Sequence, residues 1–178
     1  MTLSEWAVSG DTIRRHPLYL PIFGLFLLGA MTKSAQFPFH FWLPNAMSAP
    51  TPISAFLHAA TMVKAGIYLL MRVHPLLGGT TAWMGSLVVI GGVTAIWGAV
   101  LSLSPCDLKR MLAYTTIMAL GMLTMFLGSN NAASLTAATT FLLVHALYKA
   151  ALFLAVGSID HETGTRRRDQ LGGLWRAM

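Results

Sequence analysis

The stretch Lys33-Ser-Ala-Gln-Phe-Pro-Phe-His-Phe-Trp-Leu-Pro-Asn-Ala-Met-Ser-Ala-Pro-Thr-Pro52 is apolar enough to lie in a membrane, yet it is unsuited to one continuous helix. Pro38 and Pro44, with two further prolines at its end, each remove a backbone donor and disfavour helix in the preceding residue. We therefore predict a helix that ends near residues 33–34, an irregular link, and a half-helix that reaches about Met47. Irregular backbone at membrane depth persists only where protein or a water-filled cavity surrounds it.

Long apolar runs on both sides of this stretch predict an all-α membrane protein. Hydrophobic residues make up 55% of the 178 and charged residues only 10%, whereas a soluble domain carries about 25% charged residues. Crossing a bilayer takes about 20 mostly apolar residues in a helix, and the alternating pattern of a membrane β-barrel is missing. We expect about five transmembrane helices plus one half-helix, with the first span discontinuous. The runs are residues 17–36, 53–73, 81–103, 108–128 and 132–159.

The chain divides into a polar N-terminal segment at residues 1–16, a transmembrane core at 17–159 and a basic connector at 160–178. Loop charges predict the orientation, because Lys and Arg are enriched on cytoplasmic loops. Arg14, Arg15 and Arg72 fall on one side. The other side carries more positive charge and is expected to be cytoplasmic: Lys109, Arg110, Arg166, Arg167, Arg168 and Arg176.

Several classes of function find no support in the sequence. The net charge of +6 is not arranged as a basic face interleaved with aromatic residues, so we expect no nucleic-acid partner. Cys106 is the only cysteine, which excludes a disulfide framework or thiolate cluster. His161 and Glu162 are too few ligands for a metal site. Nucleophile elbows, phosphate loops and dinucleotide fingerprints are missing, so we expect no enzymatic site and no cofactor.

Ionisable side chains inside the apolar runs are the functional candidates, because burying one in a membrane costs several kilocalories per mole unless it snorkels, pairs or faces water. Lys33 stands beside the predicted interruption, where half-helix ends and freed carbonyls create a polar site. A lysine there suits a proton relay, and snorkelling to the interface is the structural alternative.

Five further ionisable candidates lie in later runs. Lys149 is roughly 15 Å of helix from the end of its run, too deep for easy snorkelling, and His145 precedes it by four residues on the same face. His58 and Lys64 share the second run, with packing or pairing as alternatives to a relay. Lys109 opens the fourth run, where snorkelling is the economical explanation from position alone.

The sequence closely resembles the antiporter-like subunits shared by Mrp-type monovalent cation/proton antiporters and respiratory NADH:quinone oxidoreductases. The resemblance is carried by residues 33–47 and 50–66, by Asp107-Leu-Lys-Arg-Met-Leu-Ala-Tyr-Thr-Thr116, and by His145-Ala-Leu-Tyr-Lys-Ala-Ala-Leu-Phe-Leu154. Residues 37–45 and His161-Glu-Thr-Gly-Thr-Arg166 look most like the A-type subunits of the Mrp antiporters. Respiratory relatives often have a second histidine four residues before the one at His145, and this chain has Phe141 there.

The resemblance implies a role for each candidate. Lys33 would be the lysine of the broken helix and His58 the next group along a proton path. Lys109, His145 and Lys149 would belong to a central hydrophilic axis, to which Lys64 is added from its position. The family implies inward H⁺ movement in exchange for Na⁺ or K⁺, other membrane subunits as partners, and the plasma membrane of a prokaryote as location.

The resemblance also implies parts that these 178 residues lack. The family fold has about fourteen helices with inverted repeats, a glutamate on an earlier helix that pairs with the broken-helix lysine, and a second broken helix. No acidic residue lies inside the apolar runs, so the chain is expected to be an internal fragment. Two alternatives stay open: a proton-pumping subunit of a redox-driven complex, and a fragment that only scaffolds other membrane subunits.

Overall fold

The computed structural model describes residues 10–59, 61–129 and 131–172. The first nine residues of the polar N-terminal segment and the last six of the basic connector lie outside the described residues. Regular structure in the described ranges is helical, apart from one isolated antiparallel bridge between Asp107 and Arg167. In chain order the elements are α2 (Gly10–Arg15), α3 (Tyr19–Lys33), α4 (Trp42–Asn45), the 3₁₀ helix η1 (Ala46–Ser48), α5 (Thr51–Ala59), α6 (Ala65–Leu77), α7 (Thr81–Ser102), α8 (Leu108–Gly128) and α9 (Ala132–Thr163).

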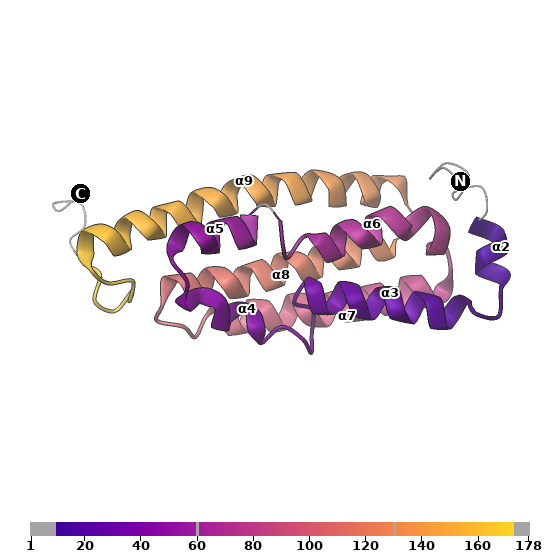
Figure 1. Ribbon diagram of the computed structural model, residues 1–178, viewed down its shortest axis with the longest axis horizontal. Coiled ribbons are helices and arrows are strands. Elements are labelled where there is room, and N and C mark those ends of the chain that lie inside the picture. The colour runs from indigo at the N-terminus through magenta and orange to yellow at the C-terminus, as the bar shows by residue number, and fades with distance from the viewer. Residues whose placement is uncertain (1–9, 60, 130, 173–178) are drawn as a thin grey trace.

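Three described helices, α7, α8 and α9, are long and apolar enough to cross a membrane. The helices lie roughly along one axis, with α9 and α7 on opposite sides of α8 (Figure 1). α8 is the central helix, because 61% of its most apolar window is buried, compared with 22% for α7 and for α9. The prediction of an all-helical membrane protein is therefore confirmed.

The two predicted spans nearest the N-terminus differ from uninterrupted membrane helices. Residues 17–36 contain α3, an apolar helix of 15 residues that ends at Lys33. Residues 53–73 are divided between α5 and α6, and the described residues 61–64 between them are not helical. The two halves pack against different partners: α5 lies along α9, and α6 lies along α3 (Figure 1). The interruption lets each half follow its own neighbour.

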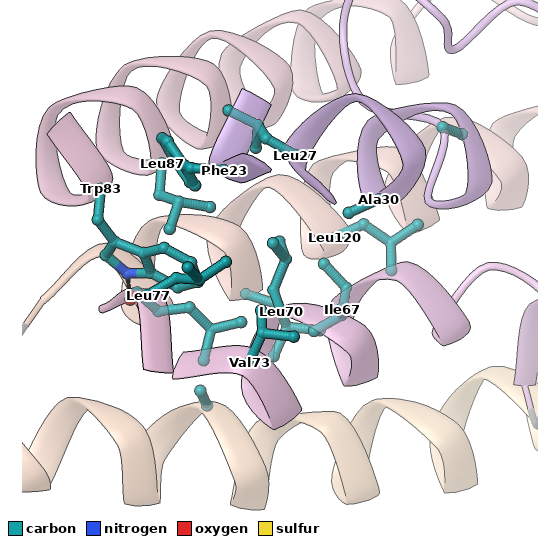
Figure 2. Packing of buried hydrophobic residues seen from close by; sticks show 14 of the residues in the cluster. Phe23, Leu27, Ala30, Ile67, Leu70, Val73, Leu77, Trp83, Leu87 and Leu120 are labelled. Carbon is teal, nitrogen blue, oxygen red and sulfur yellow. Dashed lines mark hydrogen bonds between the residues drawn. The ribbon is translucent and has the colours of Figure 1, made fainter. Parts of the chain in front are cut away.

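The apolar core joins α3 and α6 to the long helices. Phe23 of α3, Leu70 of α6 and Leu120 of α8 lie in this cluster, and Trp83 of α7 closes one end of it (Figure 2). Trp83 is fully buried, and its indole N–H donates to the carbonyl oxygen of Leu127 at 2.8 Å. The tight packing of these four helices fixes the interrupted segments around α8.

Candidate functional site

Five of the six side chains predicted to carry protons are buried in the described structure. The exposed fraction is zero for His58 and His145, 2% for Lys109 and Lys149, and 6% for Lys64. They come from the start of α8, the middle of α9, and the two helix ends that flank the break between α5 and α6. Because a buried ionisable group is costly in a membrane, a cluster of five marks the candidate functional site.

Lys109 lies in the first turn of α8, where Asp107 caps the helix by accepting a hydrogen bond from the Lys109 backbone N–H at 2.8 Å. Its Nζ donates to the carbonyl oxygen of Ala49 at 3.1 Å. Ala49 lies between η1 and α5, where the backbone leaves helical geometry. The carbonyl of Ala49, which no helix uses, therefore binds the Lys109 ammonium group. From its position in the sequence alone, this lysine is expected to extend to the membrane interface.

Lys149 reaches from α9 to the same face of α8. Its Nζ donates to the carbonyl oxygen of Leu112 at 3.2 Å and to the hydroxyl of Thr115. Leu112 is three residues after Lys109, so Lys149 contacts α8 about one turn beyond the turn that carries Lys109. Thr115 was not identified from the sequence as a partner of Lys149. The only signal for it was its position within the block of residues 107–116 that carries the family resemblance.

The two histidines lie on either side of Lys149 along α9. His145 is one turn earlier on α9. The ring of His58 from α5 lies tilted against Phe153, one turn later, with centroids 4.7 Å apart. Neither imidazole has a hydrogen-bond partner within the described part of the chain. Buried polar groups in native proteins nearly always have a partner in protein or water. Ordered water would therefore be the hydrogen-bond partner of the ring nitrogens of both histidines.

Lys64 extends the cluster toward the other end of the bundle. It forms the N-cap position of α6, and its Nζ donates to the carbonyl oxygen of Leu142 on α9 at 3.4 Å. It lines a cavity of about 410 Å³ together with Tyr68 and Leu142. His145 lies on α9 between Leu142, whose carbonyl oxygen accepts from Lys64, and Lys149.

Lys33 is not brought into this cluster. It is exposed at the end of α3 and lines a separate surface cavity of about 400 Å³ with Arg72 and Tyr68. Tyr68 borders both cavities, so it lies between the surroundings of Lys33 and those of Lys64. The structure therefore places Lys33 at the edge of the site.

The two prolines predicted to break the first span lie at different depths. Pro38 is exposed in the irregular link after α3, and Pro44 is buried within α4. The link is tied to α7, because the backbone N–H of Phe37 donates to the hydroxyl of Thr94 at 3.0 Å. The irregular segment is therefore anchored to protein at Phe37, and such contacts help to satisfy irregular backbone in a membrane.

An all-helical membrane protein with a buried row of lysines and histidines is typical of ion translocation. Comparison with known proteins identifies the family. A family profile described as NADH:quinone oxidoreductase/Mrp antiporter, TM, matches residues 3–178. The chain belongs to this family, and the predicted resemblance is confirmed.

Individual relatives are components of antiporters. The chain is 53% identical over 170 residues to the A/B component of a probable K(+)/H(+) antiporter of Rhizobium meliloti, covering 96% of this chain and 17% of that protein. It is 47% identical over 182 residues to the A-type component of the Na(+)/H(+) antiporter of Alkalihalophilus pseudofirmus, covering 94% and 23%.

A solved structure agrees with these relatives. One polypeptide of the Mrp complex from Dietzia sp. DQ12-45-1b superposes with a TM-score of 0.84 at 46% identity, over 93% of this chain and 19% of that one. The chain thus spans about a fifth of the length of the proteins it matches.

Proposed function

We propose that this chain is part of a monovalent cation/proton antiporter subunit that moves H⁺ inward in exchange for Na⁺ or K⁺. The relatives named as Na(+)/H(+) and K(+)/H(+) antiporter subunits support the reaction, and the Mrp complex supports other membrane subunits as partners. We place it in the plasma membrane of a prokaryote, with residues 160–172 and the start of α8 on the cytoplasmic side, where positive charge is enriched.

The observation that carries the proposal is the buried line of Lys109, Lys149 and His145 along α8 and α9. The ammonium group of Lys109, in the first turn of α8, binds the carbonyl oxygen of Ala49, and that of Lys149 binds α8 one turn further along. The imidazole of His145 lies one turn before Lys149 on α9. Each group accepts and releases a proton, and water between them would complete hydrogen-bonded transfer. His58 and Lys64 extend the line toward the break between α5 and α6.

We assign Lys33 to the far end of this path. Its exposed position beside a surface cavity suits a group that exchanges protons with another part of the protein, and Tyr68 separates it from Lys64. In the full-length subunit, Lys33→Ala is expected to abolish antiport while the complex still assembles.

The decisive experiment compares two adjacent cations of α8. Lys109 is 2% exposed, whereas Arg110 is exposed. In the full-length subunit, incorporated in its complex and reconstituted in vesicles, Lys109→Ala is expected to abolish Na⁺- or K⁺-dependent proton release measured with a pH-sensitive dye. Arg110→Ala is the matched control and is expected to retain antiport. Wild-type exchange by Lys109→Ala would remove Lys109 from the path.

A second candidate function follows from the family profile, which also covers NADH:quinone oxidoreductase subunits. In that case the same buried line would pump protons under the control of a redox complex. Purification of the native complex separates the two: small hydrophobic partners support the antiporter, and flavin or iron–sulfur partners support the redox-driven pump. Phe141, at the position of the second histidine common in respiratory relatives, favours the antiporter.

A further inference from the structure

The segment that follows α9 returns to the start of α8. α9 ends at Thr163, and Gly164 adopts a left-handed conformation with a φ of 68° that reverses the chain. The backbone N–H of Leu108 then donates to the carbonyl oxygen of Arg166 at 3.1 Å, and that of Arg168 donates to the carbonyl oxygen of Cys106 at 2.9 Å. Residues predicted only as a connector are therefore paired with the segment that begins α8.

Asp107 links this pairing to the helix. One carboxylate oxygen caps α8, accepting from the backbone N–H groups of Lys109 at 2.8 Å and Arg110 at 3.2 Å. The other oxygen accepts from Nε of Arg166 at 2.6 Å. A single side chain thus fixes the first turn of α8 and holds the returning segment.

Arg166 also faces the end of α9. Its Nη1 lies 3.9 Å from a carboxylate oxygen of Asp160 in the last turns of α9. The side chains of Arg166 and Asp160 are each 32% exposed and that of Asp107 is 23% exposed, so these charges are partly shielded from water. Partial burial and a short contact make this network stronger than a surface ion pair.

We propose that Asp107, Arg166 and Asp160 form a latch that joins the end of α9 to the start of α8 and thereby positions the Lys109 ammonium group at the carbonyl of Ala49. This inference rests on the proposed role of Lys109 in the proton path. The latch assigns a positioning function to Arg166, which lies outside the apolar runs.

The position of Lys109 explains why the latch matters for transport. Lys109 is two residues from Asp107, whose carboxylate accepts from the Lys109 backbone N–H and so fixes the turn that carries the lysine. The nearest hydrogen bond from α9 to α8 beyond the latch, from Lys149 to Leu112, lies one turn further along α8. If the latch opens, the first turn of α8 is free to shift relative to α9, and an error of about 1 Å between reacting groups costs up to about 100-fold in rate.

The first test separates the latch from the helix cap. In the full-length subunit within its complex, Asp107→Asn retains a capping side chain but removes the charge that Arg166 binds. We expect Asp107→Asn and Arg166→Ala each to lower the antiport rate about tenfold. The double variant is expected to be no worse than either single one, because both changes remove the same pair. Arg166→Lys, which keeps the charge, is expected to recover part of the rate.

The matched control is Arg167→Ala. Arg167 lies one residue along the same segment, and its backbone forms the bridge to Asp107, but its side chain pairs with Asp169 at 2.8 Å and not with Asp107 or Asp160. Its loss is expected to leave the rate unchanged. Equal losses in Arg167→Ala and Arg166→Ala, or additive losses in the double variant, would overturn the latch.

The second test measures by disulfide cross-linking, without any transport assay, whether the returning segment stays next to the start of α8. Cys106 is exposed, and its carbonyl oxygen accepts from the backbone N–H of Arg168 directly beside the antiparallel bridge of Asp107 and Arg167. Opposed residues of a hydrogen-bonded pair have Cα atoms about 5.5 Å apart, within the range of about 4.4–6.8 Å that a disulfide spans. Under mild oxidation, the Arg168→Cys variant is expected to form a disulfide with Cys106, quantified by peptide mass spectrometry. Adding Arg166→Ala is expected to lower the cross-linked fraction about threefold, as loss of one partly exposed pair predicts.

The two readouts distinguish the latch from the proton path. If Lys109→Ala leaves antiport unchanged, the path role of Lys109 fails, and with it the functional part of this inference, while the cross-linking result still reports on the latch. If Lys109→Ala abolishes antiport but Arg166→Ala leaves the cross-linked fraction unchanged, the path stands and the latch is overturned.

Discussion

The hydroxyl oxygen of Ser34 accepts a hydrogen bond from the backbone N–H of Ile67 at 3.1 Å. Ser34 follows directly after α3, and Ile67 lies in the first turn of α6, whose N-cap residue provides no side-chain cap. A residue 33 positions earlier therefore caps α6. The contact joins the interruption beside Lys33 to the one beside Lys64.

Removing this cap tests whether it holds the two interruptions together. Ser34→Ala leaves the buried N–H of Ile67 without its partner, and loss of a helix cap typically costs about 1 kcal/mol. We expect a lower midpoint of thermal unfolding for the full-length subunit in detergent. Ser48→Ala is the control, because Ser48 is exposed and its hydroxyl makes only a 3.5 Å bond to the nearby carbonyl of Asn45. Equal midpoints for the two variants would contradict the role of Ser34.

Gly66 tests how closely α6 approaches α3. A β-carbon added there would collide with Oγ of Ser34 and with the carbonyl oxygen of Ala30, so Gly66→Ala is expected to push the two helices apart. We expect a loss of about 1–3 kcal/mol, typical of overpacking, measured as a lower unfolding midpoint and a lower yield of assembled complex. Gly92→Ala is the control: nothing lies within 4 Å of its added β-carbon, so Ala is expected to be neutral or stabilising.

Thr115 tests the Lys149 site. Thr115→Val keeps the shape of the side chain but removes the hydroxyl that accepts from Lys149 Nζ. Because a hydrogen bond to a charged group is worth about 1.5–3 kcal/mol, the antiport rate is expected to fall about tenfold or more. Thr139→Val is the control, because it removes an exposed hydroxyl that donates only to a carbonyl of its own helix. Its antiport rate is expected to equal that of the wild type. A Thr115→Val protein with the wild-type rate would show that this contact is not used in transport.

His145 tests the imidazole step between the lysines of α6 and α9. His145→Phe retains an aromatic ring in the same space but removes both nitrogens, so we expect antiport to be abolished and assembly to be retained. His161→Phe is the control, because that histidine is exposed and its ring contacts Glu162 beside it. Proton release in vesicles measures both variants. Undiminished exchange in His145→Phe would mean that protons bypass this residue.

The sequence identifies the membrane helices because their signals are local. Apolar length alone marks α7, α8 and α9, and the prolines of residues 38–52 account for the irregular link after Lys33. The break between α5 and α6 has no such local signal, since no proline lies between Ile53 and Met71. It follows from the different partners of its two halves and from the distant cap by Ser34.

For the candidate site, too, some features follow from the sequence alone and others only from the tertiary structure. The sequence by itself determined which ionisable residues lie in apolar surroundings, because the cost of burying a charge depends first on the apolar run that carries it into the membrane. Only the tertiary structure decided that Lys109 meets Ala49, that Lys149 meets α8, that Lys33 remains at the edge, and that Arg166 returns to Asp107. These contacts join segments far apart in the chain, and helix packing rather than local pattern selects them.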